Sequence, residues 1–88
     1  MAIEDYASIA EVAGIRIKEW LPGVCKRVDF ARVSISEVFA RWCKEHPGTK
    51  MTANLFGRGM RAAARAHKLP VVRTRGGAHL IGVQLKDD

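Results

Sequence analysis

The chain has 88 residues, of which 48% are hydrophobic, and carries a formal net charge of +6. This length fits one small domain covering residues 1–88, with room for three or four helices and a hairpin. Neither a run of roughly 18 apolar residues nor a secretory leader pattern occurs, so we expect a cytoplasmic protein that does not cross a membrane.

The excess positive charge belongs to the second half of the sequence. Residues 1–46 hold seven basic and seven acidic side chains, whereas residues 47–88 hold eight basic side chains against only Asp87 and Asp88. Such an asymmetry is typical of a protein with a nucleic-acid-binding face.

The first expected helix covers about residues 4–20. Its apolar side chains recur with the helical period, at Tyr6, Ile9, Ala10, Ala13, Ile17, Trp20 and Leu21. Val12 and Ile15 lie off this stripe, and Gly14 weakens the middle of the helix. Pro22 and Gly23 are expected to end it.

The following segment, residues 24–29, fits either a helical turn or a loop. Residues 30–33 alternate enough to predict a short strand that places Phe30 on the core side.

The first of the two cysteines, Cys25, lies in the ambiguous segment 24–29. A zinc site formed with Cys43 and His46 would lack its second ligand pair, so we expect two reduced thiols, no metal and no cofactor.

The second expected helix covers residues 35–46. Ser34 and Glu37 form a capping-box pattern at its start, and Pro47 and Gly48 follow its end. One narrow face is apolar, with Ile35, Val38, Phe39, Trp42, Cys43 and His46. The opposite face mixes acids and bases, which predicts a structural helix that faces water.

The third expected helix, residues 53–68, begins after Thr52 as N-cap, with Met51 placed to pack on Phe56 as a hydrophobic staple. One face of it is polar and carries no acid: Asn54, Arg58, Arg61, Arg65 and Lys68. These like charges repel each other, and a polyanion lying along the helix would remove that cost. The pattern therefore favours nucleic acid as the partner.

Two glycines interrupt this helix, at a cost of about 1 kcal/mol each relative to alanine. We expect Gly57 to allow close approach of DNA and Gly59 to allow close approach of another helix, although ordinary packing explains both equally well.

A hairpin is expected after the third helix, with strands at 71–75 and 79–85 around the turn signal Gly76-Gly77. In its second strand His79, Ile81, Val83 and Leu85 alternate with Leu80, Gly82 and Gln84. A hairpin that follows two closely connected helices predicts an α+β fold, a winged helix-turn-helix with three helices and a C-terminal β-hairpin wing.

Three motifs occur in the order and at the spacings of a known family: residues 38–43 (VFARWC), 56–58 (FGR) and 73–77 (RTRGG), with Gly82 after them. Over residues 33–85 the chain resembles the C-terminal winged-helix domain of phage and plasmid primase-helicase replication proteins, the group of the satellite-phage replication protein and the poxvirus primase-helicase. The resemblance implies double-stranded DNA binding in replication, with origin recognition as its use.

By position, the resemblance places Thr52, Asn54, Arg58, Arg61, Arg65, Arg73 and Arg75 toward DNA. Members usually carry primase and ATPase domains in the same chain, and this sequence has no G-x-x-x-x-G-K-[ST] loop. We therefore expect either an excised domain or a small stand-alone protein. Other replication proteins are a further expected partner class.

The helical face alone assigns roles to the same residues. Asn54 and Arg58 are candidates for reading bases, Lys50 and Thr52 for holding phosphate at the helix start, and Arg61, Arg65 and Lys68 for either role. On the wing, Arg73 and Arg75 are expected at flanking phosphates or the minor groove, with His79 near the tip.

Two alternatives stay open: a protein-interaction module that docks on an acidic partner in a replication complex, and a stand-alone transcriptional repressor, which would need to dimerise. The sequence shows no nucleophile motif, so we expect neither an enzyme nor a small-molecule substrate. The aromatic residues are all expected in the core, which argues against a platform for single-stranded nucleic acid: Trp20, Phe30, Phe39, Trp42 and Phe56.

Overall fold

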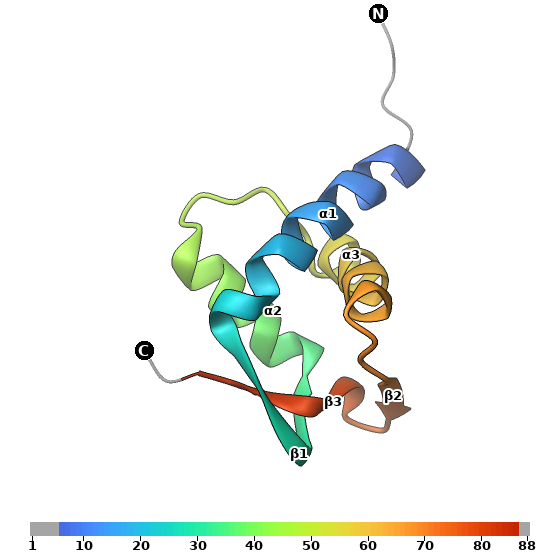
Figure 1. Ribbon diagram of the computed structural model, residues 1–88. Coiled ribbons are helices and arrows are strands. Elements are labelled where there is room, and N and C mark those ends of the chain that lie inside the picture. The colour runs from blue at the N-terminus through green and yellow to red at the C-terminus, as the bar shows by residue number, and fades with distance from the viewer. Residues whose placement is uncertain (1–5, 87–88) are drawn as a thin grey trace, which may run out of the picture.

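The computed structural model of the protein describes residues 6–86, so the expected helix start at residue 4 lies outside the described part. Within that part the elements follow in the order α1 (Tyr6–Val24), β1 (Cys25–Ser34), α2 (Ile35–Glu45), α3 (Ala53–Ala66), β2 (Val71–Thr74) and β3 (Gly77–Leu85). The strands form one antiparallel sheet in the order β1-β3-β2. The helices lie together and the sheet closes one end of the molecule (Figure 1). The protein therefore has an α+β fold, compatible with a winged helix.

The end of α1 differs from the prediction, because the helix continues through Pro22 and Gly23 to Val24. Proline has no N–H, so the Lys18 carbonyl one turn earlier lacks its helical donor. The Nε2 atom of His67 lies 2.7 Å from that carbonyl oxygen. Since a carbonyl only accepts, the imidazole donates and replaces the missing bond, and a residue distant in sequence allows the helix to continue.

The segment after α1 is also different from the prediction. Residues 25–34 form one strand, β1, in place of a turn or loop and a short strand at 30–33. Its pairing with β3 is interrupted: Arg27 lies opposite Val83 and Arg32 opposite Ile81, so residues 28–31 stand opposite Gly82 alone. The extra residues of β1 therefore form a bulge.

The bulge changes which residues of β3 face the core. Leu80 and Val83 are both buried, although an uninterrupted strand would place them on opposite faces. The predicted alternation along β3 is therefore wrong beyond Ile81. The break coincides with Gly82, whose φ of +85° is a conformation that glycine adopts readily.

Phe30 lies in this bulge, and of the five aromatic residues listed above as expected in the core it is the one whose predicted burial is wrong. Its side chain is 100% exposed, and its backbone has a φ of +65°. The other four aromatics of the predicted core are buried in it or pack against it.

The starts of α2 and α3 are those predicted. The hydroxyl of Ser34 accepts a hydrogen bond from the Glu37 amide at 3.1 Å, and that of Thr52 accepts one from the Leu55 amide at 3.1 Å. Each cap satisfies an amide that has no partner within its helix. Met51 packs against the core that contains Phe56, as expected of the staple.

The end of α3 comes at Ala66, two residues before the predicted end. The Leu69 amide donates to the Ala64 carbonyl at 2.8 Å and the Lys68 amide to the Arg65 carbonyl at 3.1 Å. Lys68 has a φ of +59°. This is the hydrogen-bond pattern of a Schellman motif, with buried Leu69 covering the last turn.

Helices α1 and α3 approach closely at a pair of glycines. A Cβ atom added at Gly59 would lie 2.9 Å from Cδ1 of Ile17 and 3.0 Å from the backbone nitrogen of Gly14. Gly59 therefore permits the close helix approach that was expected of it. By contrast, a Cβ atom at Gly57 would meet nothing within 4 Å.

The core lies between the helices and the sheet. Its largest fully buried side chains come from α1, α2, α3 and β3: Ile17, Val38, Phe56, Met60 and Leu80. Because α3 buries Phe56 and Met60, its opposite face is left to solvent.

The two glycines of α3 should respond oppositely to alanine. In Gly59→Ala the new Cβ atom clashes with the Ile17 side chain and the α1 backbone. We therefore expect this change to lower the free energy of unfolding by about 1–3 kcal/mol. Gly57→Ala has open space and gains helix propensity, so we expect a rise of about 0.5–1 kcal/mol. Urea denaturation of both variants measures this; equal effects would contradict the helix contact.

The hydrogen bond from His67 to the Lys18 carbonyl should contribute most to the free energy of unfolding when residue 22 is proline. We expect His67→Ala to lower the free energy of unfolding by about 1 kcal/mol, because it leaves the Lys18 carbonyl without a donor. In a Pro22→Ala background the residue 22 amide supplies that donor, so the same change should cost less. A double-mutant cycle in urea measures the difference, and identical costs in the two backgrounds would refute this role of His67.

Candidate nucleic-acid interface

The outer face of α3 carries the polar residues that the helical period places there. Asn54, Arg58, Arg61 and Arg65 are all exposed, while the buried residues of α3 face the core: Phe56, Gly59, Met60, Ala63 and Ala64. This orientation follows from the contact at Gly59, which holds the opposite side of α3 against α1.

The structure brings arginines from two elements together. Arg61 and Arg65 of α3 and Arg73 of β2 line one hollow of about 420 Å³, whose other lining residues are Leu69, Val71 and Ala78. None of the lining residues is acidic. The other lining residues are apolar and carry no charge, so the positive potential of the three guanidinium groups is not offset locally.

The side chains of these arginines have no partner in the described part of the chain. The guanidinium groups of Arg61, Arg65, Arg73 and Arg75 form no hydrogen bond or ion pair with another residue of the range 6–86. Arg41, in contrast, donates to the Lys86 carbonyl at 2.7 Å and lies 3.8 Å from the Glu45 carboxylate. The cations around the α3–β2 hollow are therefore available to an external anion.

The turn of the hairpin is braced by its own side chains. The hydroxyl of Thr74 accepts a hydrogen bond from the Gly76 amide at 3.2 Å, and Gly77 has a φ of +107°. The Nδ1 atom of His79 lies 3.2 Å from the Gly77 carbonyl oxygen. His79 thus contacts the turn, while Arg75 occupies the exposed tip.

The remaining predicted site residues lie at the two ends of α3. Lys68 is exposed in the turn after the helix, on the side where the Schellman motif ends it. Thr52 caps the helix start, so its hydroxyl already accepts one hydrogen bond. Lys50 is exposed in the connection between α2 and α3 but does not line the hollow of Arg61.

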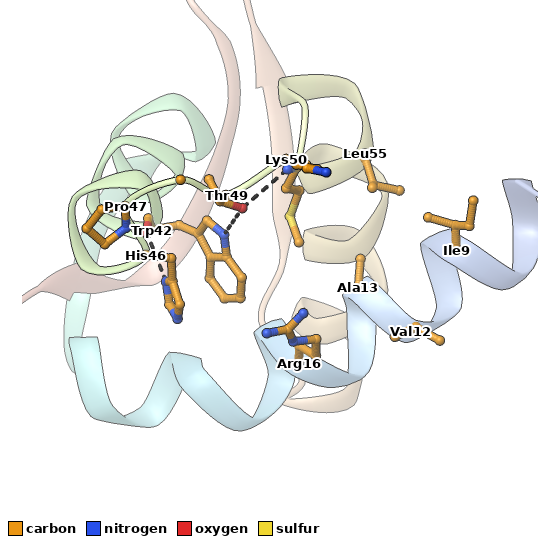
Figure 2. A pocket seen from close by; sticks show the side chains of 12 residues that line it. Ile9, Val12, Ala13, Arg16, Trp42, His46, Pro47, Thr49, Lys50 and Leu55 are labelled. Atoms are coloured by element: carbon orange, nitrogen blue, oxygen red, sulfur yellow. Dashed lines mark hydrogen bonds between the residues drawn. The ribbon is translucent and has the colours of Figure 1, made fainter.

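Lys50 instead lines a larger hollow of about 900 Å³. α1 contributes Ile9, Val12, Ala13 and Arg16 to it, and the other walls come from the end of α2, the connection and the start of α3 (Figure 2). Trp42 lies in this wall, with its indole N–H donating to Thr49 at 3.4 Å. The hollow is largely apolar and has Arg16 and Lys50 as its cations. It lies apart from the α3–β2 hollow, and the two share no lining residue.

A second group of cations lies on β1 and was not predicted as part of the site. Lys26, Arg27 and Arg32 are exposed, and the same strand has a single acid, Asp29. The Arg27 guanidinium donates to the His67 carbonyl at 2.8 Å, which places β1 beside the end of α3. Summing charge over residues 1–46 concealed this group, because Glu4 and Asp5 offset its excess, while α1 and α2 each hold two acids and two bases.

The two cysteines lie in different elements, Cys25 in β1 and Cys43 in α2. Cys25 and Cys43 are both free thiols, and within residues 6–86 no three His, Cys, Asp or Glu side chains form a metal-binding group. Burial raises the pKa of the Cys25 thiol, although Arg41 and Lys86 lower it in part. The thiol therefore stays protonated at neutral pH.

No family model matches the chain, and neither the curated proteins nor the solved structures contain a match. The resemblance to primase-helicase domains therefore stays a prediction from the motifs. Among the helices of the described residues, none combines the length and apolar character needed to cross a membrane.

Proposed function

We propose that the protein binds double-stranded DNA through the outer face of α3 and the β2–β3 hairpin. The observation that carries the proposal is the hollow lined by Arg61, Arg65 and Arg73, in which three unpaired cations from two elements meet without an acid. A phosphate backbone supplies the missing anions, and its contact releases condensed counterions.

The dimensions of α3 suit the major groove. Its 14 residues make a helix about 21 Å long, which can lie in a groove about 12 Å wide. Asn54 and Arg58 lie in its first half, where recognition helices contact bases. Each bidentate contact to adenine or guanine contributes about 1–3 kcal/mol of discrimination. Thr52 and Lys50, before the helix, are placed for phosphate at its N-terminus.

The hairpin adds a second contact. Arg73 extends the α3 face across the hollow, and Arg75 at the tip is placed to reach a flanking phosphate or the minor groove. His79 braces the turn that presents Arg75. Lys68 continues the cationic face beyond the end of α3.

The element order and the sheet order support a winged helix-turn-helix, in which α3 is the recognition helix and the hairpin is the wing. Together with the motifs at residues 38–43, 56–58 and 73–77, this favours a role in phage or plasmid DNA replication, with origin recognition as the specific task. The chain would supply DNA binding, and other proteins or domains the enzymatic steps.

The apolar hollow of Figure 2 favours a second candidate function, a protein-interaction module. Val12 lines it and is 56% exposed, and Ile15 beside it on α1 is 52% exposed. Arg16 and Lys50 would suit an acidic partner segment. This function would use the hollow and leave the α3 face without a role.

A matched pair of charge reversals separates the two functions. Arg61→Glu and Arg16→Glu change the net charge equally and both lie on exposed positions, one at each hollow. We expect Arg61→Glu to weaken duplex binding about tenfold or more, because a phosphate contact becomes a repulsion, and Arg16→Glu to weaken it less than about threefold. Fluorescence anisotropy with a labelled duplex measures both.

Salt dependence is the second readout of the same titrations. Contacts to about six phosphates predict a log-log slope near −5, and Arg61→Glu should reduce its magnitude by about one. If Arg61→Glu and Arg16→Glu bind duplex equally, or if the unaltered protein does not bind it, the DNA-binding function is wrong.

A further inference from the structure

Phe30 is a large apolar side chain that lies fully in solvent, and no packing contact explains its presence there. It is 100% exposed and sits in the bulge of residues 28–31, which stand opposite Gly82 alone. Its φ of +65° is a backbone conformation that non-glycine residues, and bulky ones above all, rarely adopt. Strain of this kind is concentrated at binding sites, where a partner group stabilises what the isolated fold does not.

The neighbours of Phe30 are charged. Lys26 and Arg32 are exposed on either side of it along β1, Asp29 is the one acid, and the adjacent Val28 and Ala31 are half-buried. The exposed valines of β2 are not its neighbours, because β2 pairs with the other edge of β3 and reaches only to Leu80. Phe30 is thus a single aromatic ring among cations.

This composition favours nucleic acid as the partner. Energetically important residues of protein interfaces lie inside an apolar patch that excludes water, and Phe30 has no such patch. Sites for unpaired nucleotides combine an exposed aromatic ring, on which a base stacks, with cations that contact the backbone.

The bulge lies at the end of the proposed DNA-binding face. Arg27 at its start donates to the carbonyl of His67, directly after α3, and Lys68 is the next residue. In Figure 1, β1 forms the lower end of the molecule. The contact of Arg27 with the residue before Lys68 therefore places the strand that carries the bulge beside the C-terminal end of α3.

We propose that Phe30 stacks on an unpaired base of DNA held on the α3 face, so that the protein binds a junction of duplex and single strand more tightly than uninterrupted duplex. The inference rests on the proposed function and extends it to a substrate class. Lys26 and Arg32 contact the backbone of the unpaired strand.

Anisotropy with three labelled DNAs tests the inference: a blunt duplex, and the same duplex with a 3′ or a 5′ single-stranded arm. We expect one armed DNA to bind about tenfold more tightly than the blunt duplex, within the range that stacking of one base supplies. Phe30→Ala should abolish that preference and leave blunt-duplex binding within about twofold. Phe30→Trp should keep the preference, and Phe30→Leu, which is apolar but not aromatic, should lose it.

The controls distinguish this inference from the proposed function. Phe30→Ala removes no buried contact, so its thermal midpoint should not fall, and Arg61→Glu should weaken all three DNAs. Suppose that blunt-duplex binding depends on Arg61 but that neither armed DNA binds more tightly than the blunt duplex. That result would overturn the stacking role alone, and so would a preference for an armed DNA that survives Phe30→Ala or Phe30→Leu. Loss of binding to every DNA in the unaltered protein would overturn the proposed function as well.

Discussion

The close approach of α1 and α3 at Gly14 and Gly59 determines what the rest of the molecule presents. A Cβ atom at Gly59 would meet both a side chain and the backbone of α1, so only glycine allows the helices to pack at this distance. That contact, with Phe56 and Met60 buried beside it, turns the apolar side of α3 inward. Arg61 and Arg65 face outward as a consequence, since residues on the opposite side of a helix cannot share its buried stripe.

The hairpin extends the exposed face of α3 into a larger cationic surface. β2 follows α3 after the Schellman turn, in which Leu69 is buried, and pairs with β3 so that Arg73 lies across the hollow from Arg61 and Arg65. One acid among these residues would neutralise much of the local potential, and the sequence has none between Pro47 and Lys86. Packing and charge thus act together, because the fold places the cations side by side and the sequence leaves them without partners.

Elements with local signals were predictable from the sequence. Ser34 and Thr52 mark helix starts through hydrogen bonds within three residues. The glycine pair predicted the hairpin, although its turn lies at Arg75 and Gly76, one residue earlier than predicted, and Gly77 already begins β3 with a φ that glycine adopts readily. Elements that depend on distant partners were not. α1 passes Pro22 because His67 donates to Lys18, and β1 forms because β3 pairs with it, neither of which appears in a local pattern.

The site was predictable to the same extent. The helical period identified the exposed arginines of α3, but their meeting with Arg73 required the docked hairpin, and Lys50 lies at a different hollow. Phe30 was assigned to the core on the assumption of strand alternation, which the bulge breaks. Its flanking cations were hidden by averaging charge over half the sequence, where a count over each predicted element would have revealed them.

The central claim is that α3 and the hairpin form one DNA-binding surface, and amide chemical-shift mapping with an unlabelled blunt duplex tests it most directly. We expect the largest shifts at Asn54, Arg58, Arg61, Arg65 and Arg73, fading together as salt is raised, with little change around Val12 and Trp42. Shifts concentrated at the apolar hollow, or an unchanged spectrum at low salt, would contradict the claim.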